Sequence, residues 1–381
     1  MSVVNSVLTY NAMSEWVINY QGGFVRRGLI GEIIFQISNL LNLNLRFTFL
    51  ILQSLLYLTF FYLIYDLLKN IKPNYFIILA IFSPIFVSFP ISELEAIGRK
   101  EVLIFITLLI SINLYFKYRN NDLLIIFISI LFPIITLTHE ASIFYSFFFI
   151  SLIFITKQKI NYYYFLKLSF FSLPTLMSIY LIYFYPHSNQ ETVIMCEELK
   201  KIGENCGFAA AFISKGIGTH IAEVGWQKAH ILRYIFIFFV GFFSLIYLAN
   251  KSRFNGEVIN PVFLKTPFVF HFILIILPTL LLFIIAVDTG RWTHMSYTTA
   301  FIYYFGLLKN RALILDEKIF RINIPNTKIR NFLYSLIFIL ICLSWNPKAV
   351  YHEDLGSFPI YRAIEKFPNY YGNIFNIQIF Q

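Results

Sequence analysis

Long apolar runs recur along almost the whole chain, and they constrain its fold more than any other feature. A helix needs about 20 mostly apolar residues to cross a bilayer. Because backbone groups in lipid must bond internally, and the runs lack a two-residue alternation, each run predicts a helix rather than a barrel strand. The predicted spans lie near residues 47–67, 74–92, 101–116, 123–138, 141–156, 164–185, 234–250, 267–287, 293–308 and 331–346.

The composition agrees with this class. Of 381 residues, 58% are hydrophobic and 13% are charged, whereas soluble domains average about 45–50% apolar and about 25% charged. We expect an all-α integral membrane protein with a single transmembrane domain over 1–381. It would have about ten transmembrane helices, or eleven if residues 1–20 form a weak first span. Residues 28–43 are only moderately apolar and predict a re-entrant or interfacial helix at the outer face.

Basic residues gather in every second loop between the predicted helices. The positive-inside rule places these loops in the cytoplasm and explains the net charge of +10 without a nucleic-acid partner. The other loops then lie outside, including a helical cap at 186–233 and a C-terminal tail at 347–381, both periplasmic if the chain lies in a bacterial inner membrane. The basic loops contain Lys69 and Lys72, Lys117 and Arg119, Lys157 and Lys159, Lys251 to Lys265, and Lys309 to Arg330.

Four short outer segments hold unusual polar residues. The first combines Gly22 and Gly23 with Arg26 and Arg27, and it ends at Glu32. Glycines let the backbone approach a ligand closely, and paired arginines offer forked donors to phosphate. A plainer interpretation is a flexible segment whose arginines contact lipid headgroups.

The second segment carries bases against the positive-inside bias. Arg99 and Lys100 lie here beside Glu93, Glu95 and Glu101. Something must compensate bases on the outer face. The three carboxylates would do so by simple neutralisation, or the bases would bind an anionic ligand.

The third and fourth segments lie in tight turns between predicted spans. His139 and Glu140 are costly at membrane depth, where such groups usually face a polar cavity, and histidine can relay protons near neutral pH. The fourth segment holds Asp288, Arg291 and His294. Here the plainer interpretation is that Asp288 and Arg291 pair with each other.

Together the four segments supply the groups needed to bind a phosphate-bearing substrate and to move a proton. We expect phosphate to be bound by Arg26, Arg27, Arg99, Lys100 and Arg291. We expect Glu32, His139, Glu140 and Asp288 to include the catalytic base, and Gly22, Gly23, Glu93, Glu95 and His294 to line the same cavity.

No cofactor and no metal are expected. The chain has no P-loop, no HExxH and no haem-attachment motif, and its three cysteines lack zinc-site spacing. Cys196 and Cys206 both lie in the outer loop, where an oxidising compartment would join them in a disulfide.

The arrangement resembles the O-antigen polymerase (Wzy) group of bacterial polysaccharide clusters, which are proteins of this size with many spans, a sizeable outer loop in the second half and many aromatic residues. The segment GGFVRRGLIGE at 22–32 is similar to one in membrane proteins of such clusters. The resemblance implies joining of undecaprenyl-diphosphate-linked repeat units, with outer-face arginines on the diphosphate. Polytopic glycosyltransferases with polyprenyl donors often keep an acid in the first outer loop, for which Glu32, Glu93 and Glu95 are candidates.

Two functions stay open. The first is glycosyl transfer or polymerisation with a polyprenyl-linked oligosaccharide, in contact with membrane lipids and with a chain-length regulator as partner. The second is a lipid-linked glycan flippase or other polysaccharide transporter, which predicts mid-span charges and an inverted repeat. Few such charges and no repeat are visible in the sequence. A third interpretation, an acyltransferase, fits His139 but lacks an acyl-donor motif.

Overall fold

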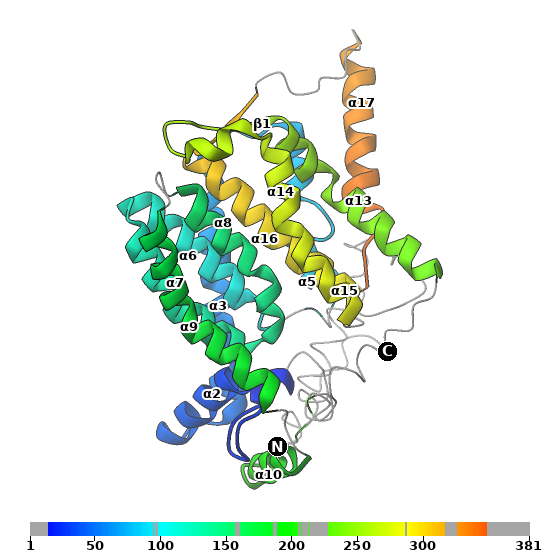
Figure 1. Ribbon diagram of the computed structural model, residues 1–381. Coiled ribbons are helices and arrows are strands. Elements are labelled where there is room, and N and C mark those ends of the chain that lie inside the picture. The colour runs from blue at the N-terminus through cyan, green and yellow to red at the C-terminus, as the bar shows by residue number, and fades with distance from the viewer. Residues whose placement is uncertain are drawn as a thin grey trace, which may run out of the picture.

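The computed structural model describes residues 14–93, 96, 98–156, 161–185, 189–204, 206, 213, 228–285, 288–316 and 326–348. Within them the chain is helical apart from one pair of short strands, and most helices stand side by side in a bundle (Figure 1). The elements are η3 (Glu15–Val17), α2 (Leu29–Leu40), α3 (Leu45–Leu68), α4 (Tyr75–Ile81), α5 (Ser88–Ser92), α6 (Val102–Tyr118), α7 (Asn121–Thr138), η5 (Glu140–Tyr145), α8 (Ser146–Thr156), α9 (Tyr162–Phe184), α10 (Asn189–Lys201), α13 (Lys228–Asn250), β1 (Ser252–Phe254), η6 (Pro261–Lys265), α14 (Phe268–Ile276), η7 (Leu277–Leu281), α15 (Leu282–Ile285), α16 (Thr289–Lys309), β2 (Leu313–Leu315), α17 (Thr327–Phe338) and the π-helical turn η8 (Ile339–Leu343).

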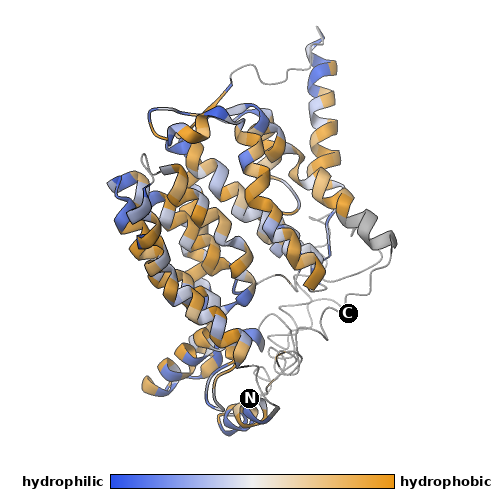
Figure 2. Cartoon of the chain, in the orientation of Figure 1, coloured by the Kyte–Doolittle hydropathy of each residue, from blue (hydrophilic) through white to orange (hydrophobic). Residues whose placement is uncertain are grey.

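Four helices in the described part of the chain are long and apolar enough to cross a membrane: α3, α7, α9 and the run Phe268–Ile285. Apolar residues cover these helices along their length (Figure 2). Large apolar side chains such as Leu58, Phe170 and Leu176 are exposed. A soluble bundle would bury such residues, whereas a lipid-facing surface exposes them. The all-α membrane class predicted from the sequence therefore agrees with the structure.

The prediction of a single helix over 74–92 is wrong. The structure has two short helices there, α4 and α5, separated by a turn in which Phe86 N donates to Ser83 O at 3.0 Å. Pro84 lies in this turn. A proline interrupts a helix because it lacks the backbone N–H and because its ring clashes with the preceding turn. The break turns the Ile85 carbonyl toward α16, where His294 Nδ1 lies 2.9 Å away.

The helix α16 lies at the centre of the bundle, packed against α6, α13 and α3. Nearly all of its residues between Thr289 and Leu307 are buried, although many are polar. Its hydroxyl groups bond back to the helix: Thr293 donates to Thr289 O at 2.8 Å and Thr299 to Met295 O at 2.7 Å. Such bonds satisfy these threonine hydroxyls inside an apolar bundle.

Loops on the basic side of the predicted topology meet at one end of the bundle. Lys309 Nζ lies 2.6 Å from Asp66 Oδ2. The strands β1 and β2 pair antiparallel, and Asn260 N donates to Ile155 O at 2.9 Å. Lys157 and Lys159 fall outside the described residues. The helix α2 lies at the opposite end (Figure 1), together with the described residues of the loops before α6 and after α7.

Candidate functional site

Ionisable residues from separate segments meet at the end of the bundle that carries α2, and we call them the charge cluster. They lie in η3, before α2, before α6, between α7 and η5, and at the start of α16, so that helix ends fix most of them. Most are buried. Its members are Glu15, Arg26, Arg27, Arg99, Lys100, Glu101, His139, Glu140, Asp288 and Arg291.

Glu15 lies at the middle of the charge cluster. Its carboxylate is 2.7 Å from Arg99 Nη1, 3.5 Å from Arg27 Nη1 and 3.3 Å from Arg291 Nη2. The neighbouring Trp16 is fully buried and donates its indole N–H to Gly98 O at 2.5 Å. One carboxylate thus joins three segments that are far apart in the sequence.

Arg27 links the glycine-rich loop to the turn after α7. Its Nε lies 2.9 and 2.7 Å from the two carboxylate oxygens of Glu140, and Arg26 Nη1 lies 3.6 Å from the same carboxylate. Arg27 has a φ of 66°, a left-handed conformation that side chains with a Cβ rarely adopt. Lys100 Nζ donates to the Arg27 carbonyl at 2.7 Å, which helps to hold this conformation.

Arg291, at the start of α16, makes contacts through all three nitrogens of its guanidinium group. Its Nε donates to Glu101 Oε1, its Nη1 lies 3.0 Å from Asp288 Oδ2, and its Nη2 lies 2.8 Å from His139 Nε2. Glu101 Oε2 and His139 Nδ1 are buried and have no hydrogen-bond partner among the described residues. Unpaired buried polar atoms are uncommon in proteins and call for an explanation, of which a functional role is one.

The surroundings shift the pKa values of the groups at this end. Burial alone would raise the pKa of Glu15, but Arg291, Arg99 and Arg27 hold it well below its usual range. Burial would likewise raise the pKa of Glu140, and Arg27 and Arg26 lower it. Burial lowers the pKa of His139 to about 4 and that of Lys100 to about 7. Two carboxylates are therefore charged and the imidazole is neutral at pH 7.

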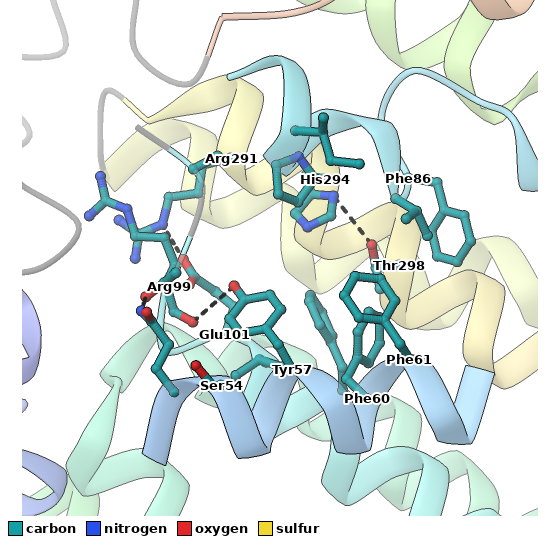
Figure 3. Close-up of a pocket in the computed structure, with 18 residues that line it drawn as sticks. Ser54, Tyr57, Phe60, Phe61, Phe86, Arg99, Glu101, Arg291, His294 and Thr298 are labelled. Carbon is teal, nitrogen blue, oxygen red and sulfur yellow. Dashed lines mark hydrogen bonds and ion pairs between the residues drawn. The ribbon is translucent and has the colours of Figure 1, made fainter. Parts of the chain in front are cut away.

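A cavity of about 360 Å³ lies between α3, α5, α6 and α16 and ends at the charge cluster. Arg99, Glu101 and Arg291 form its charged end, and the rest of its wall is mainly apolar and rich in aromatic rings (Figure 3). Phe61 and Ile91 at its apolar end are exposed on the outside of the bundle. The shape suits a ligand with an anionic head and a long apolar tail.

The structure gives Glu32 a different position from the one predicted. Its carboxylate accepts hydrogen bonds from Tyr20 N at 2.9 Å, from Gln21 Nε2 at 2.8 Å and from Gln36 Nε2 at 2.6 Å. Glu32 therefore fixes the loop before Arg26, and it lines neither the cavity nor the charge cluster.

The other predicted residues have different positions. His294 lines the cavity, as expected. Glu93 is buried at the end of α5 outside the cavity wall, and Glu95 lies outside the described residues. The remaining predicted ionisable residues meet in the charge cluster, namely Arg26, Arg27, Arg99, Lys100, His139, Glu140, Asp288 and Arg291.

Sequence reasoning missed two residues of this site, Glu15 and Glu101. Glu15 precedes the glycine-rich segment, and no motif in the sequence around it distinguishes it as a site residue. Glu101 was considered as a neutralising charge alone, although it directly precedes α6 and so lies at the membrane end of its loop.

The helix α10, the described part of the outer segment nearest the site, holds the glycine turn. The helix α10 lies against this turn, and a Cβ at Gly22 would be 2.1 Å from Glu191 O, while one at Gly23 would meet the Glu191 side chain at 3.0 Å. The predicted disulfide is present between Cys196 and Cys206. The two glycines therefore allow a close helix contact rather than a ligand contact.

Comparison of the chain with protein-family models, with curated proteins and with solved structures gives no match. Its function is therefore argued from the site alone.

Proposed function

We propose that this protein is a membrane transferase that moves a glycan from a polyprenyl phosphate or diphosphate carrier to an acceptor hydroxyl, as a surface-polysaccharide polymerase does. The observation that carries the proposal is the cavity with an aromatic wall that ends on Arg99, Arg291 and Glu101. An isoprenoid chain is apolar and unsaturated, so it packs well against aromatic rings, while its phosphate needs cations.

In this proposal the chain crosses a bacterial inner membrane about ten times. The end with Asp66, Lys309 and the paired strands faces the cytoplasm because its loops are basic. The charge cluster then faces the outer side, where lipid-linked donors replace nucleotide sugars. The helix α2, whose Leu40 and Leu41 are exposed, lies in the membrane interface.

The residues of the cavity divide the chemistry between them. Glu101 takes the proton of the acceptor hydroxyl, whose oxygen forms a bond to the anomeric carbon. The bond from that carbon to the carrier phosphate breaks, and its electron pair leaves with the phosphate, beside Arg99 and Arg291. His139 accepts a hydrogen bond from Arg291 and thereby orients its guanidinium.

The test is glycan transfer by the purified protein in lipid vesicles, with a polyprenyl-diphosphate-linked oligosaccharide as donor. Arg291→Ala and Arg99→Ala should each lower the rate by roughly 30- to 1000-fold. Arg291→Lys should recover part of it, since lysine keeps the charge but loses the fork. Lys167→Ala is the control, because Lys167 pairs with Asp122 on exposed surfaces of α9 and α7, away from the cavity.

Two outcomes would contradict the proposal. In the first, Arg291→Ala and Arg99→Ala transfer glycan at the same rate as Lys167→Ala while the protein is present in the membrane in normal amounts. The two arginines would then have a structural role only. Movement of the lipid-linked donor across the vesicle membrane without any transfer would favour the flippase instead.

A further inference from the structure

The loop that carries Arg26 and Arg27 has no regular structure of its own and is held from outside by α10. Met195 and Leu199 of α10 are buried. Met195 packs with Ile18 and Val25, and Asn19 N donates to Met195 Sδ at 3.4 Å. Because these contacts lie on both sides of the glycine turn, α10 fixes the path of the chain from η3 to Arg27.

A buried ion pair fixes the far end of α10. Arg46 Nε lies 2.8 Å from both carboxylate oxygens of Glu204, and the two side chains are 7% and 2% exposed. Arg46 is at the start of α3, and Glu204 follows α10 closely. The helix is thereby tied to the membrane bundle as well as to the loop.

The Cys196–Cys206 disulfide closes the segment between these two attachments. Leu199 packs beside Trp16 inside the closed loop, and Cys206 contacts both small apolar clusters that surround η3 and the glycine turn. We call α10, the disulfide and the Arg46–Glu204 pair the clasp.

We propose that the clasp is a positioning device that holds Arg27 against Glu140 and Glu15, so that the charge cluster is complete only while the disulfide is closed. The reason is that two of the contacts that define this loop, Asn19 with Met195 and Gly22 with Glu191, belong to α10. The effect of the clasp on catalysis rests on the proposed function. Its effect on the opening of the loop does not, and that opening is measured separately.

The experiment is limited trypsin digestion of the full chain in lipid nanodiscs, with cleavage sites identified by mass spectrometry. Trypsin cuts after arginine, and Arg26 and Arg27 are each 8% exposed, so cleavage there requires local opening. Cys196→Ser/Cys206→Ser and, independently, Glu204→Gln should raise cleavage after Arg26 or Arg27 by roughly tenfold to 100-fold. Cleavage after Lys72 and Arg119, at the other end of the bundle, should not change.

Glu198→Gln is the matched control, since it removes an exposed pair with Lys201 on the same helix. Wild-type protein treated with dithiothreitol should behave like the double serine variant and recover on reoxidation. Cleavage after Arg26 and Arg27 that stays at the level of Glu198→Gln in both clasp variants would overturn the proposal, as would equal acceleration at every site. Loop opening in the variants together with no transfer by the wild type would reject the proposed function and leave the clasp standing.

Discussion

Arg291 Nη2 lies 2.8 Å from His139 Nε2, where the start of α16 meets the end of α7. A guanidinium can only donate hydrogen bonds, so the imidazole accepts here and carries its proton on Nδ1. An imidazolium has no free lone pair and would face Arg291 with a like charge. The contact therefore requires a neutral His139.

Acid should destabilise the protein through this contact. Burial, followed by the charge of Arg27, lowers the pKa of His139 from 6.5 to about 4. Between pH 6.5 and pH 4 the unfolded state binds a proton that the folded state does not, so the free energy of unfolding falls as the pH falls. His139 should contribute roughly 2–3 kcal/mol to this loss, so His139→Gln should lose that much less stability than the wild type over the same pH range. Denaturant unfolding over this pH range measures it, and parallel curves for the two proteins would contradict it.

Glu101→Gln should abolish most transfer while keeping donor binding. The amide can still accept a hydrogen bond from Arg291 but cannot take a proton, so we expect a loss of roughly 100- to 10,000-fold in kcat. Glu140→Gln is the comparison, because Glu140 pairs with Arg27 outside the cavity wall. If Glu101→Gln keeps full activity and Glu140→Gln loses most of it, the catalytic base is not Glu101 and lies outside the cavity.

A larger side chain in the cavity should weaken binding of the donor without destabilising the fold. Ser54 lines the cavity from α3, whereas its neighbour Leu55 is exposed and lies outside the cavity wall. Ser54→Phe should raise the KM for a long-chain donor by about tenfold, and Leu55→Phe should leave it unchanged. A donor with a short chain should be less affected. Equal KM values for both variants would show that the chain binds elsewhere.

Gly31→Ala should disturb η3 from the side. A Cβ at Gly31 would lie 1.8 Å from Ile18 O and 2.8 Å from Trp16 O, so the backbone that carries Glu15 must move. We expect a loss of about 1–3 kcal/mol in stability. Gly256→Ala is the control, since its Cβ meets the flexible Leu264 side chain at 3.2 Å. Equal thermal unfolding temperatures for the two variants would contradict the tight packing.

Much of this fold could be predicted from the sequence because lipid allows few solutions. Apolar runs predicted the long helices α3, α7 and α9. The loops that the sequence identifies as basic meet at one end of the bundle. The break between α4 and α5 was missed because the run around Pro84 stays apolar, and hydropathy does not register a missing N–H.

The site was predictable where a charge was costly. Arg291 and His139 stand out since they lie next to apolar runs, and both belong to the charge cluster. Glu15 was not predictable, because its importance comes from three arginines that only the fold brings near it. Glu32 misled for the opposite reason. It ends a segment of glycines and arginines that suggests a ligand, but its carboxylate accepts hydrogen bonds from Tyr20 N and Gln21 Nε2.

The pairing of Glu15 with Arg291 joins residues 276 positions apart in the chain. During synthesis, Glu15 is made long before Arg291, and until Arg291 arrives its carboxylate can pair only with Arg27 and Arg99. The site can close only after α16 has been inserted among helices already in place. This end of the bundle is therefore completed late in synthesis, and a chain truncated before α16 would carry the earlier helices yet lack the contacts of Arg291 with Glu15 and Glu101.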